Sequence, residues 1–223
     1  MKIIRLIVAA VMPLIAFVST AQKAISEGTI TYDIMVQPKT GTSKGATSLN
    51  GAKTTVYLKG GLSRTEMTSA LGTETTIYNS TLGNGVILKE YSGQKLMITL
   101  TKENWAAINN KFSGLSFQNT SETKVIEGYN CKKAIAKVSD GSTISVYYAP
   151  DLITINKEYS QAFKNLPGFP MEYELETAQR ILKYSISKID FGPLPVSKFD
   201  FPQSGYRVMT YDENKKGKEE ANK

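Results

Sequence analysis

Histidine is absent from this sequence of 223 residues, and cysteine occurs once, as Cys131. Without histidine, the chain lacks the commonest general base, any serine–histidine or cysteine–histidine nucleophile pair, and imidazole ligands for a metal. A single cysteine excludes an intrachain disulfide. Because cysteine is among the most frequently buried residue types, we expect Cys131 to be buried in a strand, in preference to a reactive or intermolecular role.

The motifs of common enzyme and cofactor sites are missing as well. The sequence holds no Walker loop and no GxGxxG, HExxH, CxxC or GxSxG string. We therefore predict no catalytic residues, no metal and no cofactor. The formal net charge is +7, but the lysines are dispersed and form no basic block, so we expect no nucleic-acid partner.

Long apolar runs are lacking except at the start of the chain. Lys2 and Arg5 precede the apolar stretch 6–18, and small residues follow at 19–21. A helix needs about 20 apolar residues to cross a bilayer, so this stretch is too short for a transmembrane segment. Its layout predicts a signal peptide over residues 1–21, cleaved near Ala21, and an exported protein that is periplasmic or secreted. No cysteine stands near Ala21 to carry a lipid anchor.

From Gly28 onward the dominant hydrophobic period is two, which is typical of half-buried strands. In the stretch 29–36, apolar residues alternate with polar ones. Turn signals such as Asn84-Gly85 and Asp140-Gly141 separate further short strands and predict hairpins. Tight turns require antiparallel neighbours, so we expect a meander. The further strands are expected at 54–59, 62–69, 73–79, 86–91, 94–100, 122–127, 129–138, 143–149, 171–177 and 180–190.

Two segments change to helical spacing. Thr101 can cap a helix over 101–112, and Asn156 can cap one over 156–166. We expect both helices to lie on the sheet with their apolar residues facing it. Those residues are Trp105, Ile108 and Phe112 in the first helix, and Tyr159, Phe163 and Leu166 in the second.

The domain layout follows from these patterns. Residues 22–211 are expected to form a single β-rich domain, in which 38–52 is a long loop rich in glycine, serine and threonine. Three prolines follow Phe191, so any later strand should lie at a sheet edge. The charged segment 212–223 is predicted to be a disordered tail.

The row Glu172, Glu174 and Glu176 is the clearest cluster of acidic residues. It could bind Ca²⁺ or share a proton, but alternate residues on a strand are about 6.5–7 Å apart, too far for one ion. We interpret the row as a hydrated strand face balanced by Lys183 and Lys188 on a neighbouring strand.

Three segments resemble a known family: 27–32, Gly128-Tyr129-x-Cys131-Lys132-Lys133-Ala134, and the Leu-Pro-Gly-Phe-Pro stretch at 166–170. Together they resemble an exported bacterial family of unknown function that is similar to the lipoprotein-carrier (LolA-like) class, over most of residues 27–206. The resemblance implies a mainly β fold: a single curved antiparallel sheet, or half-barrel, with two or three short helices covering its concave face. It implies no catalytic residues.

Three functions remain open. The first is a carrier-like protein that is not an enzyme and binds a lipid or acyl chain between sheet and helices, with Trp105, Ile108, Phe112, Tyr159 and Phe163 as the apolar binding residues. These side chains could equally fill the core. The second is an envelope module that binds a protein partner through loop 38–52 and the sheet edges. The third, less favoured, is a hydrolase of glycans that uses paired carboxylates such as Glu172 and Glu174.

Overall fold

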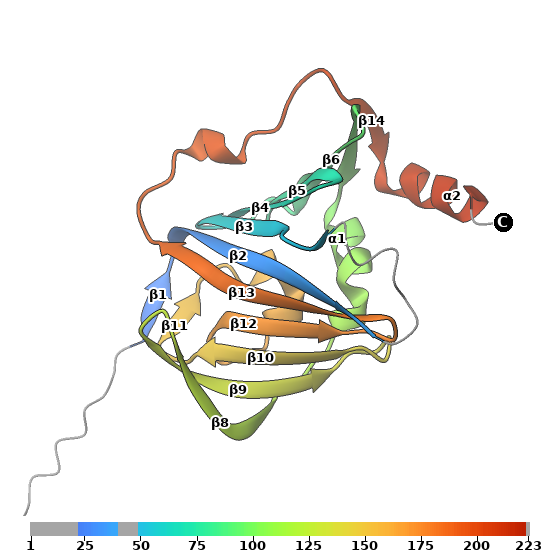
Figure 1. Ribbon diagram of the computed structural model, residues 1–223. Coiled ribbons are helices and arrows are strands. Elements are labelled where there is room, and N and C mark those ends of the chain that lie inside the picture. The colour runs from blue at the N-terminus through green and yellow to red at the C-terminus, as the bar shows by residue number, and fades with distance from the viewer. Residues whose placement is uncertain (1–21, 40–48, 222–223) are drawn as a thin grey trace, which may run out of the picture.

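The computed structural model describes residues 22–39 and 49–221, and these form a sheet of 12 strands with a separate pair of short strands (Figure 1). The signal peptide predicted for residues 1–21 lies outside the described part. The strands are β1 (Lys23–Ile25), β2 (Glu27–Pro38), β3 (Lys53–Lys59), β4 (Leu62–Ser69), β5 (Gly72–Asn79), β6 (Asn84–Tyr91), β7 (Gln94–Leu100), β8 (Gln118–Ile126), β9 (Tyr129–Lys137), β10 (Thr143–Ala149), β11 (Leu152–Thr154), β12 (Phe169–Glu176), β13 (Arg180–Asp190) and β14 (Arg207–Thr210).

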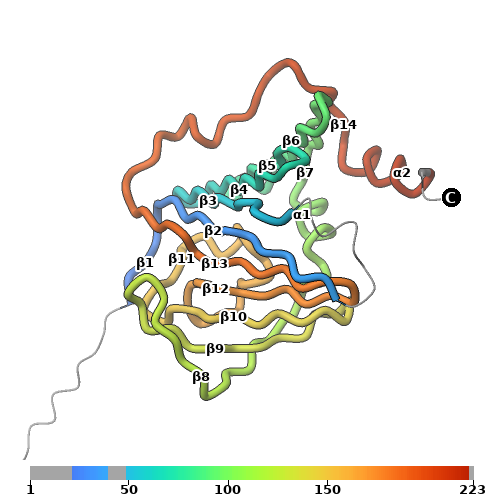
Figure 2. The backbone as a smooth tube through the Cα atoms, in the orientation of Figure 1, coloured from blue at the N-terminus to red at the C-terminus, as the bar shows by residue number. Residues whose placement is uncertain are grey.

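The large sheet has the order β14-β7-β6-β5-β4-β3-β2-β13-β12-β10-β9-β8. Strands β2 to β7 form the predicted antiparallel meander, and β13 returns along the other side of β2 (Figure 2). The sheet curves strongly but β14 and β8 do not pair with each other, so the described strands form an open half-barrel. The predicted fold class is confirmed. The parallel pairs β14–β7 and β1–β11 are exceptions to its antiparallel order.

One predicted hairpin turn is wrong. Asn84 and Gly85 lie inside β6, and the chain reverses just before them, at residues 80–83. The reason is local: the side-chain oxygen of Asn79 accepts hydrogen bonds from the backbone amides of Thr81 and Leu82, both at 3.0 Å. Gly83, with φ of +70°, then provides the left-handed conformation that closes the turn.

The first predicted helix is present as α1 (Lys102–Asn109), continued by the 3₁₀ turn η2 (Asn110–Phe112). Thr101 caps it, with a reciprocal pair of hydrogen bonds to Asn104. The second predicted helix is wrong in kind, since two 3₁₀ turns replace it: η3 (Lys157–Tyr159) and η4 (Gln161–Phe163). Asn156 does cap the first of these turns, but the extended backbone of Ser160 (φ −147°, ψ 101°) interrupts the helix.

The predicted disorder of the charged tail is also corrected, because residues 211–221 form helix α2 (Tyr211–Ala221). Thr210 and Glu213 form a reciprocal cap at its start: Thr210 Oγ1 accepts from the Glu213 amide at 3.2 Å, and a Glu213 carboxylate oxygen accepts from the Thr210 amide at 2.7 Å. Acidic residues in the first turn and Lys218 in the last complement the helix dipole.

The sheet carries apolar cores on both of its faces. On the outer face, Ile77, Val86, Leu88 and Met97 form a small core that Phe199 completes. Phe199 belongs to η5 (Val196–Phe199), part of the segment 191–206 that crosses this face before β14 pairs with the edge strand β7. We call this segment the C-terminal strap. Strand β14 confirms that a strand after the prolines lies at an edge.

On the concave face the apolar residues form two further cores. One joins β2, β3 and β12 around Ile30, Leu58 and Phe169, and the other joins β9 and β10 around Ala134, Ile144 and Val146. The α1, η3 and η4 elements lie on this side of the sheet (Figure 1). Among the described helices, none has the length and apolar character needed to cross a bilayer.

Candidate binding site

Five side chains on the concave face remain partly open to solvent although they point into the curve of the sheet. The register pairs Ile34 with Tyr184 and Tyr184 with Tyr173, so these residues share one row across β2, β13 and β12. The next row holds Val36, Leu182 and Leu175. Ile34 is fully buried, whereas the other members are half-buried. We call the half-buried set the inner wall; it consists of Val36, Tyr173, Leu175, Leu182 and Tyr184.

Aromatic rings connect the inner wall to the covering turns. Tyr173 and Tyr184 stack at a centroid distance of 4.5 Å and an interplanar angle of 11°. Phe163 of η4 meets Tyr173 edge-on at 4.7 Å, and Tyr32 meets it edge-on at 5.6 Å. Burial raises the pKa of Tyr173 and of Tyr184 above the ordinary value for tyrosine, so both phenols are neutral at physiological pH. The wall is therefore uncharged and largely apolar.

The structure divides the predicted apolar binding residues among three places. Tyr159 packs against the core around Ile30, and Phe112 and Phe163 pack against the core around Ala134. Ile108 is half-buried on α1. Trp105 stacks on Tyr78 of β5, away from both cores, with centroids 4.4 Å apart and planes 16° apart. The two cores share Tyr173, whereas the ring contact described for Trp105 is with Tyr78.

Sequence reasoning missed Tyr78, Tyr173 and Tyr184 as partners in these clusters. The period-two pattern places Tyr173 and Tyr184 on apolar strand faces, but their contact depends on the register between β12 and β13. Register is set by long-range pairing, which a local pattern does not reveal.

A hollow lies between α1 and the 3₁₀ turns, and we call it the α1 groove. It has a volume of about 470 Å³ and is open to solvent along one side. Trp105, which stacks on the buried Tyr78, contributes its aromatic surface, and Asn110, Ser113 and Gln161 are among its polar lining residues. The indole nitrogen of Trp105 is buried and has no hydrogen-bond partner in the described structure.

Gly85 is what lets Tyr78 occupy its position. The two residues are directly paired across β5 and β6. A Cβ atom on Gly85 would lie 2.2 Å from the carbonyl oxygen of Ile77 and 3.0 Å from a ring carbon of Tyr78. Any larger residue would push the ring and, through it, Trp105.

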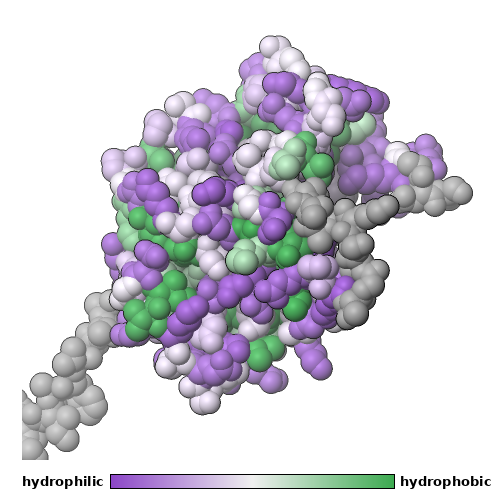
Figure 3. Space-filling view, viewed as in Figure 1, coloured by the Kyte–Doolittle hydropathy of each residue, from purple (hydrophilic) through white to green (hydrophobic). Residues whose placement is uncertain are grey.

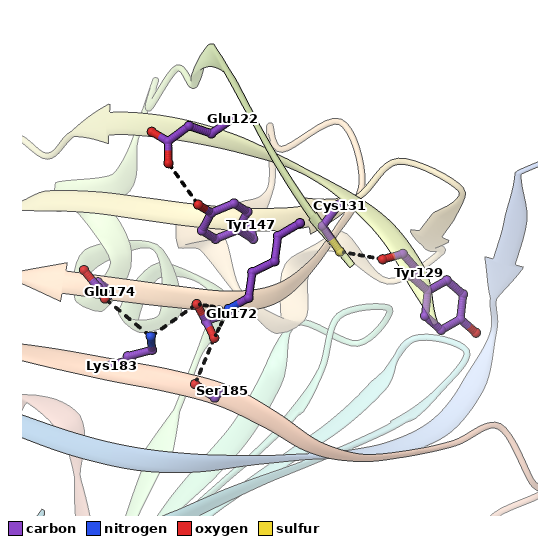
Figure 4. A network of polar contacts seen from close by, with 9 residues as sticks. Glu122, Tyr129, Cys131, Tyr147, Glu172, Glu174, Lys183 and Ser185 are labelled. Atoms are coloured by element: carbon purple, nitrogen blue, oxygen red, sulfur yellow. Dashed lines mark hydrogen bonds and ion pairs between the residues drawn. The ribbon is translucent and has the colours of Figure 1, made fainter. Parts of the chain in front are cut away.

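The acidic row lies on the outer face, in a network of charges with lysines (Figure 4). Lys124 and Lys183 place their ammonium groups 3.0 and 3.3 Å from Glu172, and Lys183 also lies 3.9 Å from Glu174. Burial works to raise the pKa of Glu172, but the two lysines outweigh it and hold that pKa below its ordinary value. Glu176 pairs instead with Lys39, at 2.5 Å.

The balance by Lys183 agrees with the interpretation of the row as a charge-paired strand face. Lys188 is exposed and lies in register with Thr31, past a bulge in β13, and no ion pair with the row is described for it. Hydrophilic and hydrophobic residues are interspersed in small patches over this side of the molecule (Figure 3). In the parts of the chain that the structure covers, no group of acidic or cysteine residues has the arrangement needed to hold a metal ion.

Cys131 lies in β9 with 1% of its surface exposed, so the predicted burial in a strand is confirmed. Its thiol donates to the backbone oxygen of Tyr129 at 3.4 Å (Figure 4). Burial raises the pKa of the thiol to about 11. At neutral pH the thiol is protonated and a weak nucleophile.

Comparisons with solved structures return proteins with a similar fold at low sequence identity. PNGF-II matches with a TM-score of 0.50 and 16% identity, over 86% of this chain and 33% of PNGF-II, so the chain spans about a third of that protein. An uncharacterized conserved protein from Thermus thermophilus has a TM-score of 0.49 and 7% identity, over 82% of this chain and 90% of that one. A LolA superfamily protein from Nitrosomonas europaea has a TM-score of 0.38 and 10% identity, over 82% and 93%.

The sequence comparisons complement these results. No curated protein matches the chain. Residues 43–157, just over half of the chain, match a family described as a domain of unknown function. The sequence predicts a family of unknown function, and the match confirms that part of the prediction. The chain belongs to the DUF4412 family.

Proposed function

We propose that this protein is an exported binding protein, without catalytic activity, that holds an apolar, lipid-like ligand against the inner wall. The observation that carries the proposal is the partial exposure of Leu182, Tyr184 and Tyr173 on the concave face of the sheet. Residues that face a filled core are normally buried, as Ile34 is in the same row. An apolar chain lying along the two rows would remove this surface from water, which is favourable by about 25 cal/mol per Å².

The shape and chemistry of the wall suit such a ligand better than a polar one. Its hydroxyl groups are the phenols of Tyr173 and Tyr184, which are neutral at physiological pH, and burial raises their pKa still further above that range. Open half-barrels and barrel mouths are common sites for apolar ligands. The proposal also includes export from the cytoplasm. Export is inferred from the apolar stretch 6–18, which lies outside the described residues.

The experiment is a titration with a fluorescent fatty acid, 11-(dansylamino)undecanoic acid, combined with native mass spectrometry of protein purified from its host. We expect saturable dansyl enhancement and a co-purified lipid mass. Leu182→Lys, which places an ammonium group in the wall, should weaken probe binding at least tenfold. Val208→Lys is the matched control, because Val208 is 61% exposed on β14, outside the wall.

Circular dichroism and a thermal melt show whether Leu182→Lys folds. If it does not, Val36→Thr provides a milder polar change in the same row. A wild-type protein that carries no lipid and leaves dansyl emission unchanged contradicts the proposal, as does a Leu182→Lys variant that folds and binds normally.

A second function, binding of an envelope protein, is favoured by strand β8. This strand forms one edge of the sheet and most of its residues are exposed, including Val125 at 65%. An exposed edge offers backbone groups for pairing with a partner strand. Crosslinking in cells with a photoreactive residue at Val125 tests whether β8 binds a partner. A specific adduct with another protein supports the proposal, and the absence of any band other than the monomer argues against it.

A further inference from the structure

We propose that the α1 groove is a second ligand site, separate from the inner wall, that binds a saccharide ring. The groove joins an aromatic surface to polar side chains at its rim. Trp105, whose ring stacks on the buried Tyr78, supplies the aromatic surface. The lining includes three side-chain amides and two hydroxyls: Asn109, Asn110, Gln161, Ser80 and Ser113. Of the amides, Asn109 already donates to the backbone oxygen of Trp105 and Gln161 to Glu158.

This combination matches the two surfaces of a sugar ring. The faces of a sugar ring carry C–H groups, which pack against the electron-rich face of an aromatic ring, while its edge carries hydroxyls. Amides and serine hydroxyls both donate and accept hydrogen bonds, so they can pair with sugar hydroxyls that act as donors or as acceptors. A volume of about 470 Å³ is within the usual range for ligand pockets.

The unpartnered indole nitrogen of Trp105 is an independent observation that points to a ligand. The atom is buried, and nothing in the described chain accepts its proton. A buried donor without a partner is unfavourable, and native proteins rarely keep one without a ligand, water or ion to satisfy it. In this conformation the nitrogen exposes almost no surface, so a sugar hydroxyl would accept its proton only once the indole ring turns toward the groove; an acyl chain offers no acceptor at all.

The openness of the groove favours a saccharide over an apolar or aromatic ligand. One side of the groove faces solvent, so part of any ligand remains hydrated. A hydroxylated ring tolerates that hydration, whereas an acyl chain would keep apolar surface in water. The lining carries two lysines and one glutamate: Lys164 is paired with Glu158 at 2.6 Å, and Lys102, at the start of α1, is a further positive group at the rim.

The groove is distinct from the inner wall although the two are neighbours. Turn η4 lies between them: Gln161 lines the groove, while Phe163, two residues on, contacts Tyr173 of the wall. A variant in one site should therefore leave the other functional, which allows the two proposals to fail separately.

Intrinsic fluorescence gives a direct test, because Trp105 is the only tryptophan in the sequence. The probes are maltohexaose, chitohexaose and xylohexaose, titrated to 5 mM into the purified protein. We expect at least one to change tryptophan emission saturably. Asn110→Ala and Gln161→Ala should each weaken that binding at least fivefold, while Gln94→Ala, an exposed amide at the far end of β7, should not change it.

Two further variants separate a binding role from a structural one. Trp105→Phe keeps a ring in the stack but removes the N–H group, so calorimetry should show at least fivefold weaker binding in a protein that melts near the wild-type temperature. Leu182→Lys should lose acyl-chain binding but retain the saccharide. The inference is overturned if no saccharide changes emission, if adenosine or lipid vesicles alone do so, or if Asn110→Ala and Gln161→Ala bind normally.

Discussion

Tyr78 and Trp105 form a nearly parallel ring stack, 4.4 Å between centroids, that joins strand β5 to helix α1. None of the residues of α1 is fully buried, and Trp105 is the residue of the helix whose ring contact with the sheet is described. Aromatic pairs contribute about 0.5–1.5 kcal/mol beyond the area they bury. The stack therefore fixes the helix as well as lining the groove.

Replacing Tyr78 by Leu should loosen α1 and expose the indole. We expect the tryptophan emission maximum to move to longer wavelength and the free energy of unfolding to fall by about 1–2 kcal/mol, since the stack and some packing are lost. Tyr91→Leu serves as a control, because Tyr91 is the last residue of β6, at the end of the strand opposite to Gly85, the residue paired with Tyr78. An unshifted emission maximum in Tyr78→Leu would show that the stack does not hold the helix.

Gly85→Ala should be destabilising, although alanine is ordinarily better than glycine within a strand. The added Cβ would meet the backbone oxygen of Ile77 at 2.2 Å, and backbone cannot move aside as a flexible side chain can. Such overpacking costs about 1–3 kcal/mol. Chemical denaturation measures it. Gly93→Ala provides a comparison in which the added atom meets nothing within 4 Å but the φ of +78° is strained.

Much of the fold could be predicted from the sequence, because its strands are half-buried and alternate cleanly. Segments 94–100, 143–149 and 180–190 match β7, β10 and β13 in both bounds. The errors arise where a side chain interacts with nearby backbone: Asn79 moves a turn, and Thr210 with Glu213 starts a helix in the charged tail. The site was harder to predict, because the contact between Tyr78 and Trp105 joins β5 to α1 and so depends on the tertiary structure.

Phe199→Ala should release the C-terminal strap from the outer face of the sheet. Phe199 is 6% exposed and completes the small core with Ile77, Val86, Leu88 and Met97. Removing a buried phenylalanine ring costs about 3 kcal/mol or more. Hydrogen exchange should rise first over residues 191–206, with β2 and β13 still protected. Uniformly faster exchange across the sheet would indicate instead that the strap is needed for the whole fold.

Arg64 offers a second way to test the strap. Its guanidinium donates to the backbone oxygens of Lys198 and Asp200, at 3.1 and 3.4 Å. Arg64→Met removes these bonds but keeps much of the side-chain length, so we expect a smaller loss than in Phe199→Ala, about 1 kcal/mol, with faster exchange confined to the same segment.

Glu172→Gln should destabilise the protein at neutral pH and lose its effect in acid. Because the folded-state pKa of Glu172 is lowered, its charge stabilises the fold above the ordinary carboxyl pKa, and this contribution disappears as pH falls through the lowered value. At pH 7 we expect a loss of about 1 kcal/mol, since Lys124 and Lys183 lose their shared partner. Urea denaturation at pH 7 and pH 3 measures the difference. An equal loss at both pH values would mean that the charge is not responsible.

The buried thiol of Cys131 should lower the free energy of unfolding at alkaline pH. Burial raises the pKa of its thiol from about 9 to about 11, so between these values the unfolded chain releases a proton that the folded protein keeps. The contribution of the neutral thiol is therefore complete below pH 9 and is lost as pH rises through 11. A difference of two pKa units corresponds to about 2–3 kcal/mol. Buried tyrosines such as Tyr32 also have raised pKa values, so alkali weakens the fold through them too.

The comparison with Cys131→Ala isolates the thiol, because both proteins share those tyrosines. At pH 7 the variant should be less stable, owing to the lost sulfur contacts. Between pH 9 and pH 11 the gap should narrow by about 2 kcal/mol, as measured by urea denaturation under reducing conditions. Slow reaction with a thiol reagent at pH 8 and rapid reaction in urea would agree with burial. A gap that stays constant up to pH 11 would show that the folded thiol ionises as readily as the unfolded one.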